Sequence, residues 1–106
     1  MIQVVYRRKK NSLRIEGHAF SGEAGHDLVC AGVSALAYTL AANVEQMRAQ
    51  GQVQEASVKM EKGNACIWCE AVTDCEDMVR RVFEAVCVGF EIMAENFPKN
   101  ISYSVS

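Results

Sequence analysis

Residues 17–36, GHAFSGEAGHDLVCAGVSAL, bring two histidines, an aspartate, a cysteine and a serine into one short segment. A cysteine thiolate is a strong nucleophile, and a histidine within hydrogen-bond reach is the base that commonly activates it. Cys30 paired with either His18 or His26 could therefore carry out acyl transfer. The alternative is a structural cysteine that packs on an alanine-rich helix behind a turn.

The apolar pattern predicts a helix from about Leu28 to Gln50, with Cys30 near its start. Apolar residues recur at spacings of three and four over residues 28–50 and stop before Gly51. Asp27 stands where an N-cap is expected, which would make Cys30 the third helical residue. Backbone N–H groups lack partners there, and the helix dipole favours an anion. This position would favour a thiolate and could help to stabilise an oxyanion.

Two further polar residues have both a catalytic and a structural interpretation. Ser34 follows Cys30 by one helical turn, so its hydroxyl can share that face, either as a donor to the site or as a small packing residue. Asp27 could orient a protonated histidine, or it could serve only as the helix cap.

The residues alone leave the choice of base open. His26 is close to Cys30 in sequence, whereas His18 follows a predicted strand, and a rigid element suits a catalytic base. Strict strand alternation places His18 on the polar face. Gly17 must therefore bend or bulge the strand end if His18 is to reach Cys30.

The elements that must position these residues follow from periodicity. Alternating apolar and polar residues predict strands over residues 2–6, 13–15, 53–60, 65–72 and 101–105. A second helix opens with the capping-box pattern of Thr73 and Glu76 and ends before Pro98. The order β-β-α-β-β-α-β predicts one α+β domain over residues 1–106. We expect a two-layer sandwich, with a mainly antiparallel sheet and two helices on one face.

Composition narrows the classes of partner. Hydrophobic residues make up 50% of the chain and charged residues 23%, which is typical of a globular protein. The net charge of -2 argues against a nucleic-acid binder, and the basic run at residues 7–10 is typical of a solvated hairpin tip. The first predicted helix is apolar nearly all round, so we expect neighbouring chain or a partner subunit to cover its second side.

The same features predict a cytoplasmic protein. A strand pattern begins at Ile2 in place of a charged and apolar leader, and no apolar run is expected to be long enough to span a membrane. The five cysteines are an odd number, which favours reduced thiols over a disulfide framework.

The remaining cysteines predict no metal or redox site. Cys66 and Cys69 form a C-x-x-C inside a strand pattern, where residues three apart point to opposite faces. No second ligand pair has zinc-site spacing. Cys75 and Cys87 are interpreted as surface or packing thiols, and we expect no cofactor.

A motif across residues 17–36 carries a family resemblance. Its residues are Gly17, His18, Ala19, Gly25, Asp27, Val29, Cys30, Ala31, Val33, Ser34, Ala35 and Leu36. This motif resembles that of the ribosomal-processing cysteine protease Prp family, as do the chain length, the element order and the Phe97-Pro98 helix end.

The resemblance implies a catalytic dyad of His18 as base and Cys30 as nucleophile. Asp27 and Ser34 would be supporting residues, and His26 would occupy a variable position. The substrate loop would comprise Ala19, Phe20, Ser21, Gly22 and Gly25.

The resemblance also implies a substrate and an assembly. The family removes a short N-terminal extension from large-subunit ribosomal protein number twenty-seven, which supports ribosome assembly. The resemblance implies a homodimer that acts on this peptide, without direct contact with nucleic acid or membrane. The alternative function is a non-catalytic, ribosome-associated assembly protein that binds peptide or RNA, in which Cys30 only packs.

Overall fold

The computed structural model describes the backbone of residues 1–17 and 26–106, and the side chains of residues 1–17 and 28–106. Its elements are β1 (Ile2–Arg7), a 3₁₀ turn (Arg8–Lys10), β2 (Ser12–Glu16), α1 (His26–Ala49), β3 (Val53–Glu61), β4 (Asn64–Ala71), a second 3₁₀ turn (Thr73–Cys75), α2 (Glu76–Asn96) and β5 (Ile101–Val105). The predicted order β-β-α-β-β-α-β is confirmed for the described part of the chain.

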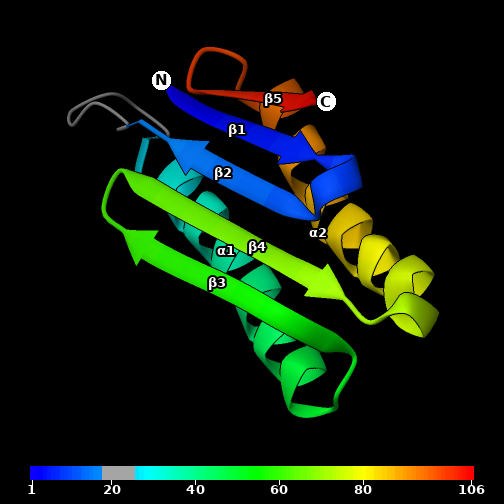
Figure 1. Ribbon diagram of the computed structural model, residues 1–106. Coiled ribbons are helices and arrows are strands. Elements are labelled where there is room, and N and C mark those ends of the chain that lie inside the picture. Colours follow the sequence, from blue (N-terminus) through cyan, green and yellow to red (C-terminus); the bar gives the residue numbers. More distant parts are fainter. Residues whose placement is uncertain (18–25) are drawn as a thin grey trace.

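The five strands form one sheet in the order β3-β4-β2-β1-β5. All neighbouring strands are antiparallel except β1 and β5, which run parallel. Both helices lie on one side of the sheet, and the opposite side is open (Figure 1). The predicted α+β class, with a mainly antiparallel sheet and two helices on one face, is therefore confirmed.

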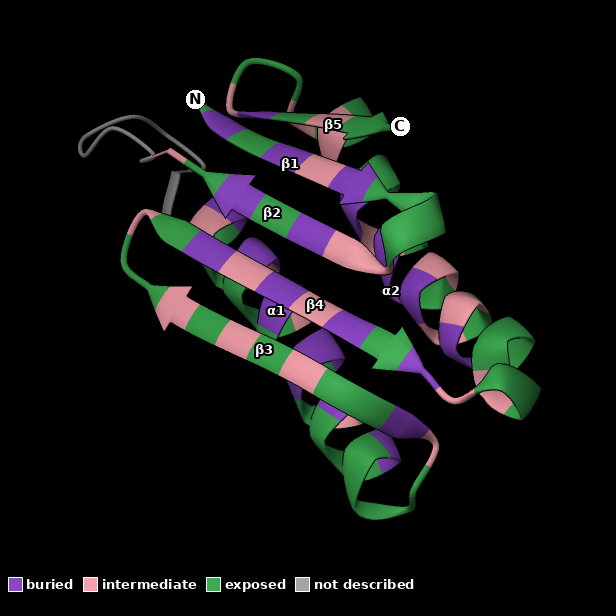
Figure 2. Ribbon diagram, in the orientation of Figure 1, coloured by how far each residue is buried: buried purple, intermediate pink, exposed green. Residues whose placement is uncertain are grey.

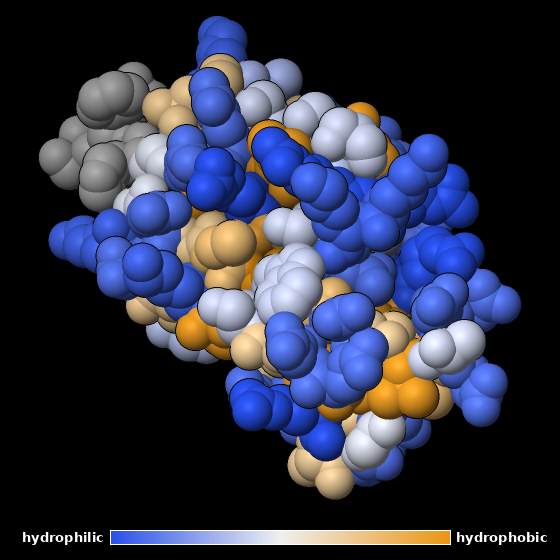
Figure 3. Space-filling view, viewed as in Figure 1, coloured by the Kyte–Doolittle hydropathy of each residue, from blue (hydrophilic) through white to orange (hydrophobic). Residues whose placement is uncertain are grey.

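Strand alternation separates a buried face from an open one. Along β4, for example, Ile67 and Cys69 are buried against the helices, whereas Cys66 and Trp68 lie on the other face (Figure 2). This alternation places the two cysteines of the C-x-x-C on opposite faces, as predicted. The open face is mainly hydrophilic (Figure 3).

The core lies between the sheet and the two helices. Its largest fully buried side chains include Phe83 and Phe90 from α2 and Leu40 from α1. The helices approach each other closely at Gly89, where an added Cβ would lie 2.6 Å from the Cδ2 atom of Leu36. This contact and the packing of α1 on β3 and β4 hold α1 in place against the sheet. The first turns of α1 are positioned as part of the same helix.

The predicted capping box of α2 is wrong. Thr73 begins a 3₁₀ turn, and the N-cap of α2 is Cys75, which makes no side-chain capping hydrogen bond. The backbone N–H of Cys75 donates to the carbonyl oxygen of Val72 at 2.8 Å. Because of this tight turn, the α-helix begins later in the chain than the Thr-x-x-Glu pattern indicates.

The expectation that no segment is long and apolar enough to span a bilayer is also wrong. Residues Leu28–Ala49 of α1 meet that criterion by length and composition alone. One side of α1 nevertheless packs on the sheet through buried residues such as Val29 and Val44. A core helix of this kind meets the same criterion, because burial and bilayer insertion both select apolar residues.

Candidate functional site

A cavity of about 550 Å³ opens where β2 ends, between the N-terminal half of α1 and the β3–β4 turn. We call it the Cys30 cavity. Its lining includes Cys30 and Ser34 from α1, and Gly17, which follows β2. Apolar side chains such as Ile15 and Val33 form much of its wall. This end of the sheet is therefore where the chemistry predicted from residues 17–36 would take place.

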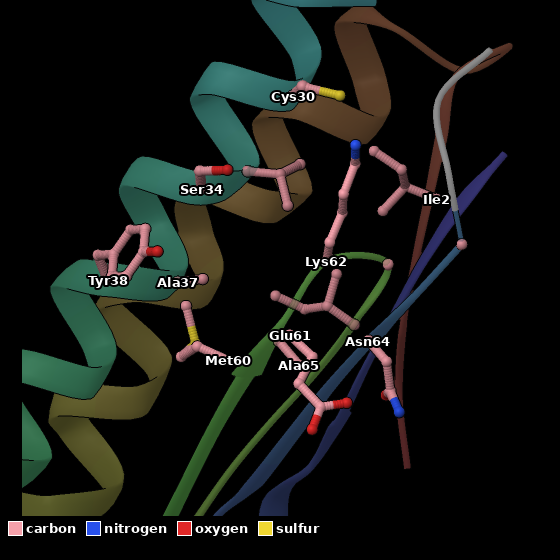
Figure 4. A pocket seen from close by; sticks show the side chains of 14 residues that line it. Ile2, Cys30, Ser34, Ala37, Tyr38, Met60, Glu61, Lys62, Asn64 and Ala65 are labelled. Atoms are coloured by element: carbon pink, nitrogen blue, oxygen red, sulfur yellow. The ribbon is translucent and has the colours of Figure 1, made fainter.

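Cys30 and Ser34 lie one turn apart on the same face of α1, in agreement with their spacing. Both side chains are turned toward the cavity, and Tyr38 follows one turn further along the helix (Figure 4). Cys30 is half-buried and Ser34 is exposed. The cavity thus presents a nucleophilic sulfur and a hydroxyl on the same wall.

The helix begins earlier than the sequence indicated. Because α1 starts at His26, Asp27 is its second residue and is not the N-cap. An acidic residue is favourable at the cap and also in the first turn, so the residue type could not separate the two positions. Cys30 is the fifth helical residue, beyond the first four N–H groups that lack helical acceptors. The predicted third position of Cys30 is therefore wrong, as is the oxyanion role of its own amide.

Gly17 has a left-handed backbone conformation at the end of β2, where the sequence requires a bend. Its φ angle is +110°, and an added Cβ would lie 2.2 Å from the carbonyl oxygen of Met1. Its backbone N–H donates to the carbonyl oxygen of Gly63 in the β3–β4 turn, at 3.1 Å. Only glycine accommodates both this backbone conformation and this close approach.

Several predicted site residues lie outside the described residues. They are His18 and the proposed substrate-loop residues Ala19, Phe20, Ser21, Gly22 and Gly25. The side chains of His26 and Asp27 are also outside the description. The approach of His18 to Cys30 therefore stays a prediction.

Substituting Gly17 with alanine should destabilise the fold more than the same change at Gly51. Both glycines have positive φ angles, and an alanine in such a conformation costs about 1–3 kcal/mol. A Cβ at Gly51 would meet nothing within 4 Å, whereas a Cβ at Gly17 would overlap the backbone of Met1. Urea unfolding of the two variants measures the difference. Equal losses in the free energy of unfolding would show that the backbone at Met1 moves aside without an energetic penalty.

The β3–β4 turn was missed as part of the site. Residues 61–64 join two predicted strands and carry no predicted site residue, yet Glu61, Lys62 and Asn64 line the cavity opposite Cys30. The antiparallel pairing of β2 with β4 places Asn64 beside Glu16 and so carries the turn to the end of β2. No local sequence signal contains this pairing, because the two strands are far apart in the chain.

Burial makes two of the other cysteines weaker acids. Burial raises the pKa of Cys69 to about 11, and it does the same for Cys87, where Glu84 adds to the rise and a hydrogen bond with Tyr103 opposes it. Both thiols are buried and neither lines the Cys30 cavity. They are therefore poor candidates for a nucleophile at neutral pH.

Comparison with protein families finds a match over nearly the whole chain. A family model described as cysteine protease Prp matches residues 1–102. Among curated proteins, none matches the chain significantly.

Solved structures give the same fold. The Streptococcus mutans protein SMU.848 is 29% identical with a TM-score of 0.71, and the match covers 99% of this chain and 93% of that one. The ribosomal-processing protease Prp from S. aureus, solved with a covalently linked product peptide, is 24% identical with a TM-score of 0.74, and both chains are fully covered. The same S. aureus protease solved with a substrate peptide is 21% identical with a TM-score of 0.70 over 99% of this chain and 97% of that one.

Proposed function

The chain belongs to the cysteine protease Prp family, and from this premise we propose that it removes the N-terminal extension of large-subunit ribosomal protein number twenty-seven. The observation that carries the proposal is the Cys30 cavity, in which the proposed nucleophile faces an open space beside the end of β2. The Prp protease from S. aureus was solved with a substrate peptide, which supports a peptide ligand for this fold.

The proposed mechanism is acyl transfer through a thioester. The sulfur of Cys30 attacks the scissile carbonyl, while His18 accepts the thiol proton and passes it to the leaving amine. Water then attacks the thioester carbon with His18 as base, which breaks the carbon–sulfur bond and returns the thiol. Asp27 would orient the protonated histidine, and Ser34 would donate a hydrogen bond to Cys30 or to the peptide.

The loop that joins β2 to α1 would close over the bound peptide. The residues proposed for this role are Ala19, Phe20, Ser21, Gly22 and Gly25. Gly17 supports the proposal because its positive φ angle is a backbone conformation that can bend the strand end just before His18. We also propose that the protein acts in the cytoplasm, because its odd number of five cysteines favours reduced thiols, which are typical of that compartment.

The function is tested by incubating the purified protein with the ribosomal protein of its own host in two forms. One form carries the N-terminal extension and the other starts at the mature residue. Mass spectrometry should show a single cut that removes the extension and leaves the mature form intact. An uncut extended protein would refute the proposal, and cuts at many unrelated sites would refute its specificity.

We further propose that the protein is a homodimer that uses the outer face of α1. Only 33% of the most apolar stretch of this helix is buried by other parts of the chain, so most of that stretch is left uncovered. Leu28 and Tyr38 are each 63% exposed, and exposed Ala31 and Ala35 lie between them. A contiguous apolar surface of this kind on a small domain is typical of a subunit interface.

A charge placed on this face should separate the subunits. We expect Ala35→Arg to shift the protein from dimer to monomer in analytical ultracentrifugation, because an arginine without a partner would be buried at the interface. Ser57→Arg, at an exposed position on the open face of the sheet, is the matched control and should stay dimeric. A wild-type protein that sediments as a monomer at micromolar concentration would contradict the dimer.

A further inference from the structure

The β3–β4 turn brings a cation into the Cys30 cavity. Among the described residues that line the cavity, Lys62 is the only basic one. Its side chain extends from the turn toward the end of the cavity where Cys30 lies (Figure 4). Glu61 also lines the cavity, but its carboxylate lies on the far side of the turn from Cys30, as does the amide of Asn64. The charge that faces Cys30 from this turn is therefore positive.

The turn holds its position through backbone contacts on both sides. Glu61 and Asn64 are paired at the end of the β3–β4 ladder, and Asn64 pairs with Glu16 of β2. The carbonyl oxygen of Gly63 accepts the hydrogen bond from Gly17. Lys62 thus extends from a backbone that is fixed to the same strand end from which the chain continues to His18.

The opposite wall of the cavity is formed by α1. It contributes the thiol of Cys30 and the hydroxyl of Ser34, and no charged side chain among the described residues. Much of the remaining lining is apolar, including Ile2, Val33 and Met60. An anion that enters this space would meet the cation of Lys62 on one side and the hydroxyl of Ser34 on the other.

Peptide hydrolysis creates an anion at this place. When water cleaves the thioester, its oxygen joins the carbonyl carbon, the carbon–sulfur bond breaks and the sulfur regains a proton. The fragment on the N-terminal side of the cut then ends in a carboxylate beside Cys30. The intact substrate has only a neutral carbonyl there, so the carboxylate distinguishes product from substrate.

We propose that the ammonium of Lys62 binds the C-terminal carboxylate of the released extension and thereby holds this product in the Cys30 cavity. The inference rests on the proposed function, because it assumes that peptide is cleaved at Cys30. Under this proposal, Lys62 determines how tightly the product binds and how fast it is released. Rising concentrations of the free extension would then inhibit further cleavage.

The test compares two synthetic peptides that span the extension up to the cut found by mass spectrometry. One ends in a free carboxylate and the other in a carboxamide. Isothermal titration calorimetry should show that the wild-type protein binds the carboxylate about tenfold more tightly, which corresponds to about 1.4 kcal/mol. In Lys62→Met this preference should fall to about onefold, whereas Lys62→Arg should keep most of it because the charge is retained.

Lys59→Met is the matched control. Lys59 lies on β3 opposite Cys66, on the open face of the sheet, so the variant loses the same charge outside the cavity. It should keep the wild-type preference for the carboxylate.

Two failures are distinguishable. If the wild-type protein cleaves the extended substrate but binds both peptides equally, or if Lys62→Met keeps the full preference, this inference is wrong and the proposed function stands. If the wild-type protein does not cleave the extended substrate, the proposed function fails and this inference falls with it.

Discussion

Replacing Cys30 with alanine should lower the rate of cleavage by at least about a thousandfold, because removing a catalytic nucleophile leaves only the contributions of substrate binding and electrostatics. The fold should survive, since Cys30 is only half-buried and alanine is a good helix former. The measurement is the rate of loss of the extended ribosomal protein, followed by mass spectrometry, with circular dichroism to confirm the native helix content. Cys30→Ser should be similarly inactive, because a serine hydroxyl is a much weaker nucleophile at neutral pH.

Cys66→Ala is the matched control for Cys30→Ala. Cys66 is also half-buried, but it lies on the open face of the sheet and does not line the Cys30 cavity. This variant should cleave at the wild-type rate. Retained cleavage by Cys30→Ala would remove Cys30 as the nucleophile. A folded Cys30→Ala variant that still supported ribosome assembly in cells would favour the non-catalytic alternative.

His18→Ala should lower the cleavage rate by about 10²–10⁴-fold, the usual contribution of a general base. His26→Ala should change the rate by no more than a few-fold, because the proposed dyad assigns no proton transfer to it. The two residues bracket the same loop, so each variant is the control for the other. Both rates are measured with the extended ribosomal protein under identical conditions.

The comparison of the two histidines tests the resemblance and the geometry together. Gly17 has a positive φ angle at the end of β2, and a bend there is the condition for His18 to approach Cys30. A larger loss in His26→Ala would assign the base to the first residue of α1. In that case the conformation of Gly17 would serve the close approach to Met1 rather than catalysis.

Most of the fold was predictable because its signals are local. Alternation along strands such as β4 and the repeat of apolar residues along α1 report which side of each element is buried. The errors lie at helix starts and in the interpretation of α1. At Asp27 and Thr73 the residue types suit a helix cap, but α1 begins at His26 and a 3₁₀ turn precedes α2. Hydropathy alone also could not separate a core helix from one that spans a bilayer.

The sequence by itself determined the element order, the nucleophile candidate and the hydroxyl that shares its helical face. Cys30 and Ser34 are four residues apart, and helix geometry converts that spacing into a shared face wherever the helix lies. Only the tertiary structure decided what stands opposite them. Lys62 reaches the Cys30 cavity because β4 pairs with β2 in a register that sets Asn64 beside Glu16. Alternation shows which face of a strand is buried, but it does not name the partner strand, so the opposite wall of the site became visible only in the folded chain.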